Sequence, residues 1–589
     1  MRFASVFTAV VMTAVTALSQ TGSINNTIGS SGSFTIKDGS TTFFTLAQSN
    51  GYLTLAKSVS LAYTTGSTLG VIFKGADRFI HDYHGSGTNG FNTFVGVNAG
   101  NFTMSGSNGE ASNNTAIGNS AMYFLTSGYD NSATGSYALF NNTSGTANTA
   151  SGSHSLFSNT TGTENSGFGF QSLYSATTAT GNSAFGSFSL YLNTTGFDNS
   201  AFGAASLNYN TTGSQNAAFG RFALYSNTTG DWNCAFGPFS LEHNTTSLNN
   251  SAFGFKSLYV NTAECNSAFG SSSLRANSTG TYNSAFGYFS LVENTTGGAN
   301  CAFGTFSLAS NTVGLNNSAF GFKSLYSNTT SNDNSSFGNL SLYNNTGAQN
   351  TAVGHKSLYT NITGYQNTAV GDSALYGNTG NYNTAIGYNA GSQVTSGANL
   401  TLIGIDANPS SGTALDEITL GNSYVATLRC NTQTISSLSD ARDKRNIRDL
   451  PLGLDFLMTV KPRLFNWDRR EWYKDGKPDG SKMKEEPTAG FIAQELDTAQ
   501  MNAQAEWLNL VLKTNPERLE ATSGNLLPVV VKAIQELKAE NNSLRTENNL
   551  LKDRLTSLEQ QVARALELIR HSSTQTSLTE HPNNIKEAQ

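Results

Sequence analysis

The sequence predicts a mainly β chain, in which a repetitive β-solenoid or β-roll shaft is followed by a small α+β domain and a C-terminal coiled coil. Three observations predict this order. A motif that ends in glycine recurs every 17 residues through the middle of the chain. Charge is concentrated from residue 439 onward, where 22 of the 33 Lys and Arg and 23 of the 39 Asp and Glu lie. A heptad pattern follows that charged segment.

Residues 1–19 resemble a secretory signal peptide, which predicts a secreted or cell-surface location. Arg2 supplies a minimal basic start, the stretch from Ala4 to Leu18 is mostly apolar, and small side chains stand at Ala17 and Ser19, the positions that signal peptidase recognises. The apolar stretch is short and interrupted by Thr, which argues against a membrane span. A buried N-terminal strand or helix is the alternative. Residues 20–85 are expected to form an N-terminal β segment.

Residues 86–408 are predicted to form the shaft. The glycine of the Asn-Ser-Ala-Phe-Gly motif stands at 118, 135, 152 and onward to 404, at intervals of 17 residues with three of 16. A typical unit contains Asn199–Gly203, Ala204–Leu207 and Asn210–Gly213. It predicts two short strands and two turns, with Asn-Thr-Thr-Gly supplying left-handed and tight-turn conformations. Because so short a unit cannot bury a core alone, units must stack, and each is expected to bury a Phe and a Leu.

These units, with the lead-in segments Gly70–Gly75 and Arg78–Tyr83, resemble the heads of trimeric autotransporter adhesins and the shafts of phage-tail-fibre-like surface proteins. The adhesin heads have a shorter unit. The resemblance implies a shaft that contacts a cell-surface glycan or receptor. A spacer without a ligand is the plainer alternative, and ice binding through the Thr pairs is disfavoured because those pairs lie in turns. Neither paired carboxylates nor a Ser/His/Asp arrangement recurs in the repeats, so an enzyme site there is not expected.

Cysteine, histidine and net charge exclude several other classes of function. Cys234 and Cys301 occupy a position that other repeats fill with Ser or Thr, and Cys265 and Cys430 have no evident partner, so no disulfide framework is predicted. His81 and His84 are the only close histidine pair, and we expect no metal and no cofactor. The formal net charge of −6, without a basic stripe, gives nucleic-acid binding little support.

After a β linker at 409–438, the charged domain is expected at 439–533. Apolar residues between Ile447 and Val460 predict a helix or strand that packs on a core, Pro462 to Trp467 predicts a strand, and Asp475–Gly480 predicts a turn-rich loop. Gly490–Leu496 is expected to open a further helix.

The segment 534–570 is predicted to be a coiled coil, and 571–589 a disordered tail. Dimer and trimer both remain open, because an Asn at an a position fixes register and mildly favours two strands. The apolar and Asn residues fall in heptad register, with Ile534, Asn541, Asn548, Leu555, Val562 and Ile569 at a positions and Leu537, Leu544, Leu551, Leu558 and Ala565 at d positions.

Ser439 and Lys444 are the candidate catalytic residues. A serine near a lysine can form a nucleophile and general-base pair, provided that the lysine loses its proton in a buried setting. Attack of the Ser439 hydroxyl on the preceding carbonyl would convert the Leu438–Ser439 amide into an ester that water can hydrolyse. Asp440 and Arg442 could position the turn between them.

The motif Ser439-Asp440-x-Arg442-x-Lys444-x-x-Ile447, together with 462–467, 490–496 and 531–537, resembles the intramolecular chaperone auto-processing domain of the endosialidase type found on phage tail spikes. The resemblance covers about residues 436–545. Domains of this type are also found in a membrane-bound transcription-factor family. It implies a homotrimer in which the domain aligns three chains, lets the shaft fold and cuts itself free, with Ser439 as nucleophile and Lys444 as general base. A phage or prophage tail fibre and a chaperone that does not cleave are the alternatives.

Overall fold

The computed structural model describes residues 33–38, 41–47, 53–55, 59–425, 427–429 and 439–576. The predicted signal peptide, Cys430, Leu438 and residues 577–589 lie outside the described residues. The chain forms two compact units, the first ending at Thr296 and the second beginning at Gly297. It is a mainly β chain with a β-solenoid of about 18 turns, a repeat of about 17 residues and a small C-terminal domain.

The first unit begins with antiparallel strands. β1 (Ser33–Asp38), β2 (Thr41–Ala47) and β3 (Leu53–Leu55) form one sheet in that order. β4 (Ile72–Lys74) pairs with β5 (Asp77–His81), which pairs in turn with β6 (Thr93–Val95), the strand that begins the parallel stack.

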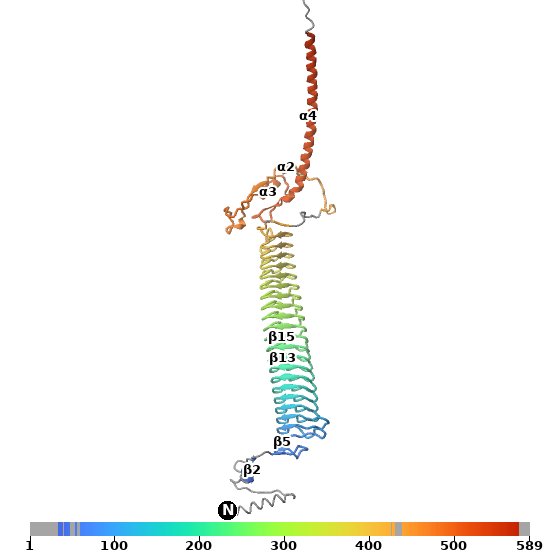
Figure 1. Ribbon diagram of the computed structural model, residues 1–589, viewed down its shortest axis with the longest axis vertical. Helices are drawn as coiled ribbons and strands as arrows, with labels where there is room; N and C mark the ends of the chain where they lie inside the picture. Colours follow the sequence, from blue (N-terminus) through green and yellow to red (C-terminus); the bar gives the residue numbers. More distant parts are fainter. Residues whose placement is uncertain are drawn as a thin grey trace, which may run out of the picture. The chain divides into compact units, whose positions relative to one another are not determined.

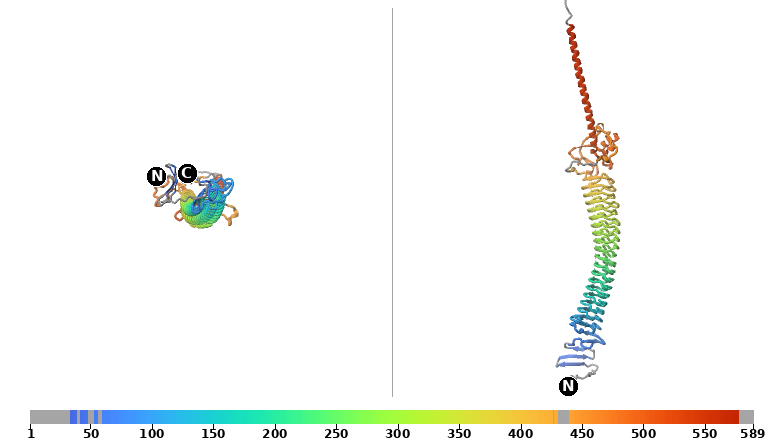
Figure 2. Two further views of the ribbon diagram at one scale, coloured as in Figure 1. Left: turned by 90° about the horizontal axis from the view of Figure 1, so that it is seen from below. Right: turned by 90° about the vertical axis from the view of Figure 1, so that its right-hand side faces the viewer.

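Each later turn of the first unit adds one parallel strand of three residues in strict register, so that Ser200, Ala201 and Phe202 lie beside Ala217, Ala218 and Phe219. Figure 1 shows these turns from blue to green, and Figure 2 shows them wound one over the next. The strands after β6 are β7 (Thr115–Ile117), β8 (Ser132–Thr134), β9 (Thr149–Ser151), β10 (Ser166–Phe168), β11 (Ser183–Phe185), β12 (Ser200–Phe202), β13 (Ala217–Phe219), β14 (Cys234–Phe236), β15 (Ser251–Phe253), β16 (Ser267–Phe269) and β17 (Ser284–Phe286).

The prediction of two strands per unit is wrong, because the residues after each strand form turns. The predicted burial of Phe is also wrong. In β12, Ala201 is fully buried while Ser200 and Phe202 point outward and are partly exposed. Side chains alternate along a strand, so only the middle residue of three can face the interior. The fully buried Leu207 of the following turn completes the apolar core as predicted.

The outward phenylalanines form a ladder. Rings one turn apart are stacked, with centroids 4.6 Å apart between Phe185 and Phe202 and 4.7 Å apart between Phe202 and Phe219. Each ring therefore covers a face of its neighbour, which shields part of the apolar surface without placing it in the core.

Two rows of buried asparagines fill the rest of the interior. In the first row, Asn199 donates from Nδ2 to Oδ1 of Asn182 at 3.1 Å and to the carbonyl of Gly213 at 2.8 Å. In the second row, Asn210 donates from Nδ2 to Oδ1 of Asn193 at 2.8 Å. Because a buried amide is stable only when hydrogen bonded, these rows explain why Asn recurs at fixed positions.

The left-handed conformations do not lie in the Asn-Thr-Thr-Gly turn as predicted. They fall instead at Asp198 (φ 54°), Ala205 (φ 55°) and Leu207 (φ 49°). A Cβ at Gly213 would lie 2.5 Å from Oδ1 of Asn210, so a larger residue there requires that amide to shift.

The turn between two strands absorbs the shortened repeats. Between β15 and β16 the repeat has one residue fewer, yet Ser251 still pairs with Ser267. Asn266 remains in the first asparagine row, since its backbone N–H donates to Oδ1 of Asn250 at 3.0 Å. A deletion in the turn therefore leaves the strand register unchanged.

The second unit continues the same one-strand turns and extends beyond residue 408. β25 pairs in parallel with β24 and lies inside the segment 409–438, for which a β linker is predicted. The strands are β18 (Cys301–Phe303), β19 (Ser318–Phe320), β20 (Ser335–Phe337), β21 (Thr351–Val353), β22 (Thr368–Val370), β23 (Thr384–Ile386), β24 (Thr401–Ile403) and β25 (Ile418–Leu420).

The C-terminal module of the second unit combines short helices and two-stranded sheets. β26 (Arg463–Phe465), at the predicted strand, pairs with β27 (Thr488–Gly490), and β28 (Val511–Leu512) pairs with β29 (Glu520–Ala521). The helices are α2 (Leu454–Leu457), α3 (Ala493–Asn502), which follows the predicted opening at Gly490–Leu496, and α4 (Leu527–Thr576), with 3₁₀ turns at Ala441–Asp443, Arg470–Trp472, Glu506–Leu508 and Ser523–Leu526.

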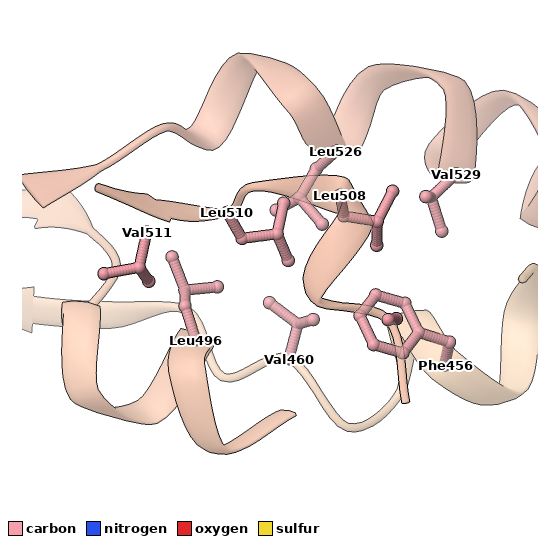
Figure 3. Close-up of a cluster of buried hydrophobic side chains, with 9 residues drawn as sticks. Phe456, Val460, Leu496, Leu508, Leu510, Val511, Leu526 and Val529 are labelled. Carbon is pink, nitrogen blue, oxygen red and sulfur yellow. The ribbon is translucent and has the colours of Figure 1, made fainter. Parts of the chain in front are cut away.

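The module has its own hydrophobic core, shown in Figure 3. Phe456 and Val460 from the α2 region meet Leu496 of α3 and Val529 from the first turn of α4. Ile447, expected to help pack this core, is 73% exposed. The core joins α4 to the module through residues near its N-terminal end.

Helix α4 begins at Leu527 and continues to Thr576. Residues 571–576 are therefore helical, although the predicted disordered tail includes them. The helix continues this far because the sequence contains neither Gly nor Pro between Pro528 and Pro582. Pro528 itself stands in the first turn, where proline is tolerated.

Candidate functional site

Ser439 and Lys444 lie at the start of the C-terminal module, on either side of the 3₁₀ turn Ala441–Asp443. The ammonium Nζ of Lys444 donates a hydrogen bond to Oγ of Ser439 at 2.5 Å. The two candidate catalytic residues are therefore in direct contact within one chain. The contact places the two side chains within the hydrogen-bond reach that a nucleophile and its base require, although a base would accept the Ser439 proton instead of donating one.

Asp440 and Arg442 hold the turn that brings the pair together. The carboxylate of Asp440 accepts a hydrogen bond from the backbone N–H of Arg442 at 2.8 Å, and its Oδ2 lies 2.6 Å from Nη2 of the same residue. The side-chain hydrogen bond to Arg442, followed by the backbone one, lowers the pKa of Asp440. Asp440 and Arg442 contact each other, and neither residue contacts Ser439 or Lys444 in a described hydrogen bond or ion pair.

All four of these side chains are exposed in the single chain. A lysine can act as a general base only after it has lost its proton, and burial favours that loss. The chain by itself leaves Lys444 at the surface. The Leu438 carbonyl, which would be attacked, lies outside the described residues.

The rest of α4 presents its predicted heptad positions to solvent. The large apolar side chains at these positions are 55–64% exposed at Ile534, Leu544, Leu551, Leu558 and Ile569. An isolated helix of this length with an unpaired apolar stripe is unusual in water, because helical stability in proteins comes mainly from packing of the apolar face. The stripe is suited to packing against other helices.

Glu536 connects α4 to the body of the module, a role that sequence reasoning missed. Its Oε2 accepts the backbone N–H of Leu454 at 2.7 Å, at the N-terminal end of α2. A carboxylate at a helix N-terminus satisfies an otherwise unpaired donor. Its only sequence signal was its place in the motif 531–537.

Arg469 is a second residue that was missed. Its Nη1 donates to the carbonyl of Ser423, just beyond β25, at 3.2 Å, and its guanidinium lies 4.4 Å from the ring centre of Trp467. The module thereby contacts the last solenoid turn of the second unit. An arginine in a charged loop gives no sequence signal for such a contact.

The other candidate groups have structural roles. His81 is buried, and its Nε2 lies 2.8 Å from the carbonyl of Ala99. Cys234 and Cys301 occupy the first position of their strands, where other turns place Ser. Within the described part of the chain, no group of three or more His, Cys, Asp or Glu could hold a metal ion. No helix in that part is long and apolar enough to cross a membrane.

Comparison with known proteins addresses the module directly. The comparisons with curated proteins and with solved structures give no match. Residues 439–504, which begin at Ser439 and include α2, β26, β27 and α3, match the family model described as chaperone of endosialidase. Together with the β-solenoid, this match supports a fibre-like protein with a C-terminal chaperone domain, similar to tail-fibre and endosialidase proteins.

Proposed function

We propose that this chain forms a homotrimeric fibre whose C-terminal module aligns three copies through α4, supports folding of the solenoid and then cleaves its own Leu438–Ser439 bond. The observation that carries the proposal is the 2.5 Å hydrogen bond between Lys444 Nζ and Ser439 Oγ at the first residue of the chaperone match. The pair lies after the last solenoid strand, at the start of the module that would be released.

The reaction needs a neutral Lys444. Its amine takes the proton from the Ser439 hydroxyl, and Oγ attacks the carbonyl carbon of Leu438. As the tetrahedral intermediate collapses, the C–N bond breaks and the Ser439 nitrogen takes the proton back from Lys444. The product is an ester between Leu438 and Oγ of Ser439. Water hydrolyses the ester, which leaves a carboxyl group on Leu438 and a free amino group on Ser439.

Assembly would supply what the single chain lacks. Lys444 is exposed in one chain, and α4 carries an unpaired apolar stripe suited to other copies. When copies associate along α4, neighbouring modules can cover Lys444 and favour its neutral form. Cleavage would then follow assembly, and the module would act once per chain.

A second candidate function is a permanent assembly clamp that never cleaves. The exposure of Lys444 favours it, because a lysine needs a buried setting to act as a general base. In this case Ser439 to Lys444 is a solvated junction. The module would still align the chains and stay covalently attached.

The place of action forms part of the same proposal. The segment 1–19, together with the weakly charged repeats, supports a secreted or cell-surface fibre that contacts a glycan or receptor. A fibre on a virus particle is the alternative. Mass analysis of fibres purified from their source distinguishes the two, because a retained hydrophobic N-terminus supports the virus fibre.

The deciding experiment is intact-mass analysis of wild type beside Ser439→Ala and Lys444→Ala. We expect wild type to release the fragment Ser439–Gln589 and both variants to remain whole. Lys444→Arg is the matched control, since it keeps the charge but cannot act as a base at neutral pH. A wild type that remains whole but trimeric establishes the clamp, and one that remains whole and monomeric overturns both functions.

A further inference from the structure

We propose that a groove between α2 and the start of α4 receives Val531 of a neighbouring copy of this chain. The groove is called here the module groove. The proposal rests on the association of copies through α4 proposed above, because it names the place on the module where one copy meets the next.

The module groove is an apolar depression of about 590 Å³. None of the residues that line it is charged. Val460 and Leu526 belong both to this lining and to the hydrophobic core in Figure 3, so the groove lies directly over that core. A depression of this size and composition suits an apolar group of a partner. Its apolar lining comes mainly from Leu457, Val460, Pro462, Phe491, Leu526 and Val530.

The wall of the groove on α4 continues the heptad stripe of the predicted coiled coil. Leu527 and Val530 line the groove, and they stand one heptad before Ile534 and Leu537, at the a and d positions of the same register. Leu527 is 66% exposed. The apolar stripe therefore runs from the later turns of α4 into the groove, and a helix that packs on the stripe also reaches the groove.

The charges beside the stripe indicate that this helix is another copy of α4 in parallel register. In a parallel coiled coil, each g residue faces the next e residue of the neighbouring helix, and charges at these positions set the choice and orientation of the partner. Three successive contacts of this kind would join opposite charges between two identical helices. They pair Glu540 with Arg545, Glu547 with Lys552 and Arg554 with Glu559.

The same geometry, applied to the first heptad, brings Val531 of one copy to the groove of the next. Val531 stands at an e position and is 48% exposed, and Leu526, at the preceding g position, lines the groove. The module covers the c and g side of its own helix, since Val529 and Ala533 are buried there. The neighbour's e residue therefore arrives between α4 and the module, where the groove lies.

An apolar residue at this e position is explained by such a contact. The later e positions Lys538, Arg545 and Lys552 are charged, as is usual at the edge of a coiled coil. The groove is larger than one valine side chain, and Leu527, one helical turn before Val531 on the same face, can fill more of it. Each copy presents a groove and a Val531 on opposite sides of its stripe, so the contacts repeat from copy to copy and close into a ring.

The test replaces Val531 in the full-length protein with the photoreactive residue p-benzoylphenylalanine and irradiates the assembled protein. We expect a product of two linked copies on a denaturing gel, with peptide mapping placing the link at 457–462 or at Phe491 of the other copy. Gln535, exposed at a b position one helical turn later, is the matched control and should give no link to the groove.

A second measurement compares charged variants at the same two positions. Val531→Asp should raise the Kd of association about tenfold or more, because it places a carboxylate against an apolar groove. Gln535→Asp should leave the Kd unchanged. Analytical ultracentrifugation measures both values, and circular dichroism verifies that each variant is folded.

The inference is overturned if the link from position 531 stays within one chain or reaches another copy outside the groove. It is also overturned if the two aspartate variants associate alike. An assembled protein with either result loses this contact but keeps association through α4, whereas a monomeric wild type overturns the proposed assembly as well. The mass of the same samples reports self-cleavage separately.

Discussion

One turn after Asn159, Ala176 occupies the position at which neighbouring turns place an asparagine, and the buried Oδ1 of Asn159 has no hydrogen-bond partner among the described residues. Asn159 still donates from Nδ2 to Asn142 at 2.8 Å. The second asparagine row of the first unit is therefore broken at a single turn. Asn193, on the far side of the break, resumes the row by accepting from Asn210.

The break predicts that Ala176→Asn stabilises the solenoid. The new amide would donate to Oδ1 of Asn159 and accept from Asn193, for a gain of about 0.5–1.5 kcal/mol. In this variant, residue 179, three positions after the new asparagine, is alanine where most turns have glycine. A side chain there is compatible with an asparagine, because Asn244 hydrogen bonds to the carbonyl of Ser247 at the equivalent position of another turn. Chemical denaturation measures the effect. Asn210→Ala, which removes an existing link, should lower stability, and an unchanged or lower stability of Ala176→Asn contradicts the prediction.

The interior position of Leu207 predicts an asymmetry between two apolar residues of one turn. Leu207→Ala should destabilise the protein by about 2–5 kcal/mol, because it opens a cavity in a close-packed core. Phe202→Ala should cost clearly less, since its ring lies on the outer ladder and is partly exposed. Denaturant unfolding of the two variants compares them directly. Equal losses would show that the Phe ladder contributes as much as the core.

Burial of His81 predicts a loss of stability in mild acid. Desolvation lowers the pKa of His81 from 6.5 to about 4, so the folded state keeps the ring neutral while the unfolded state takes up a proton. The stability that this neutral ring maintains is complete above pH 6.5, falls as the pH drops toward 4, and levels off below that at a loss of about 3 kcal/mol.

Hydrogen exchange of residues 77–100 between pH 7 and pH 4 tests this prediction, after correction for the intrinsic pH dependence of exchange. His81→Gln, which cannot titrate, should show a weaker dependence on pH. The same dependence in both proteins would assign the acid sensitivity to other groups.

The hydrogen bond between Glu536 and Leu454 predicts that the attachment of the first turns of α4 to α2 contributes to the stability of the module. Glu536→Ala leaves the Leu454 N–H without this acceptor and should destabilise the module by about 1–2 kcal/mol. Glu540→Ala is the matched control, because Glu540 is exposed one helical turn further along. Thermal unfolding followed by circular dichroism compares the two. Equal changes in melting temperature would mean that helix propensity, and not the hydrogen bond to Leu454, accounts for the effect of Glu536→Ala.

The two asparagines at a positions of α4 predict that the helix assembly is less stable but has a better-defined register than one with apolar residues there. Replacing Asn541 and Asn548 together with Ile should raise the melting temperature of the assembly, because apolar a positions pack better. The same change should broaden the distribution of oligomers, which light scattering after size-exclusion chromatography measures. A single unchanged oligomer in the variant would show that the module, and not the helix, fixes the number of chains.

The stacked repeat could be predicted because Asn, Gly and Leu recur at a fixed period along the sequence. The placement of Phe could not, since Ala201 and Phe202 are both apolar and the pattern alone does not say which faces inward. The narrow interior decides, because it admits Ala, Leu, Ser and Asn from each turn. The left-handed conformation at Leu207 was equally hidden, since leucine rarely adopts it.

In the module, local relationships could be predicted and distant ones could not. Ser439 and Lys444 are five residues apart, and the chemistry of the pair suggested their contact before the structure showed it. Glu536 and Leu454 are 82 residues apart, so only the folded core brings them together. The proposed covering of Lys444 would depend on neighbouring chains in an assembly, which a pattern within one chain does not encode.

The constant register across full and shortened turns has a consequence for how such chains change over generations. Each turn meets the next through the same strand pairing and the same asparagine contacts, as between β12 and β13 or between β15 and β16. Duplication or loss of one near-identical coding segment therefore adds or removes a whole turn without creating a new kind of junction. Length can vary among descendants in discrete steps, while the flanking segments stay as they were.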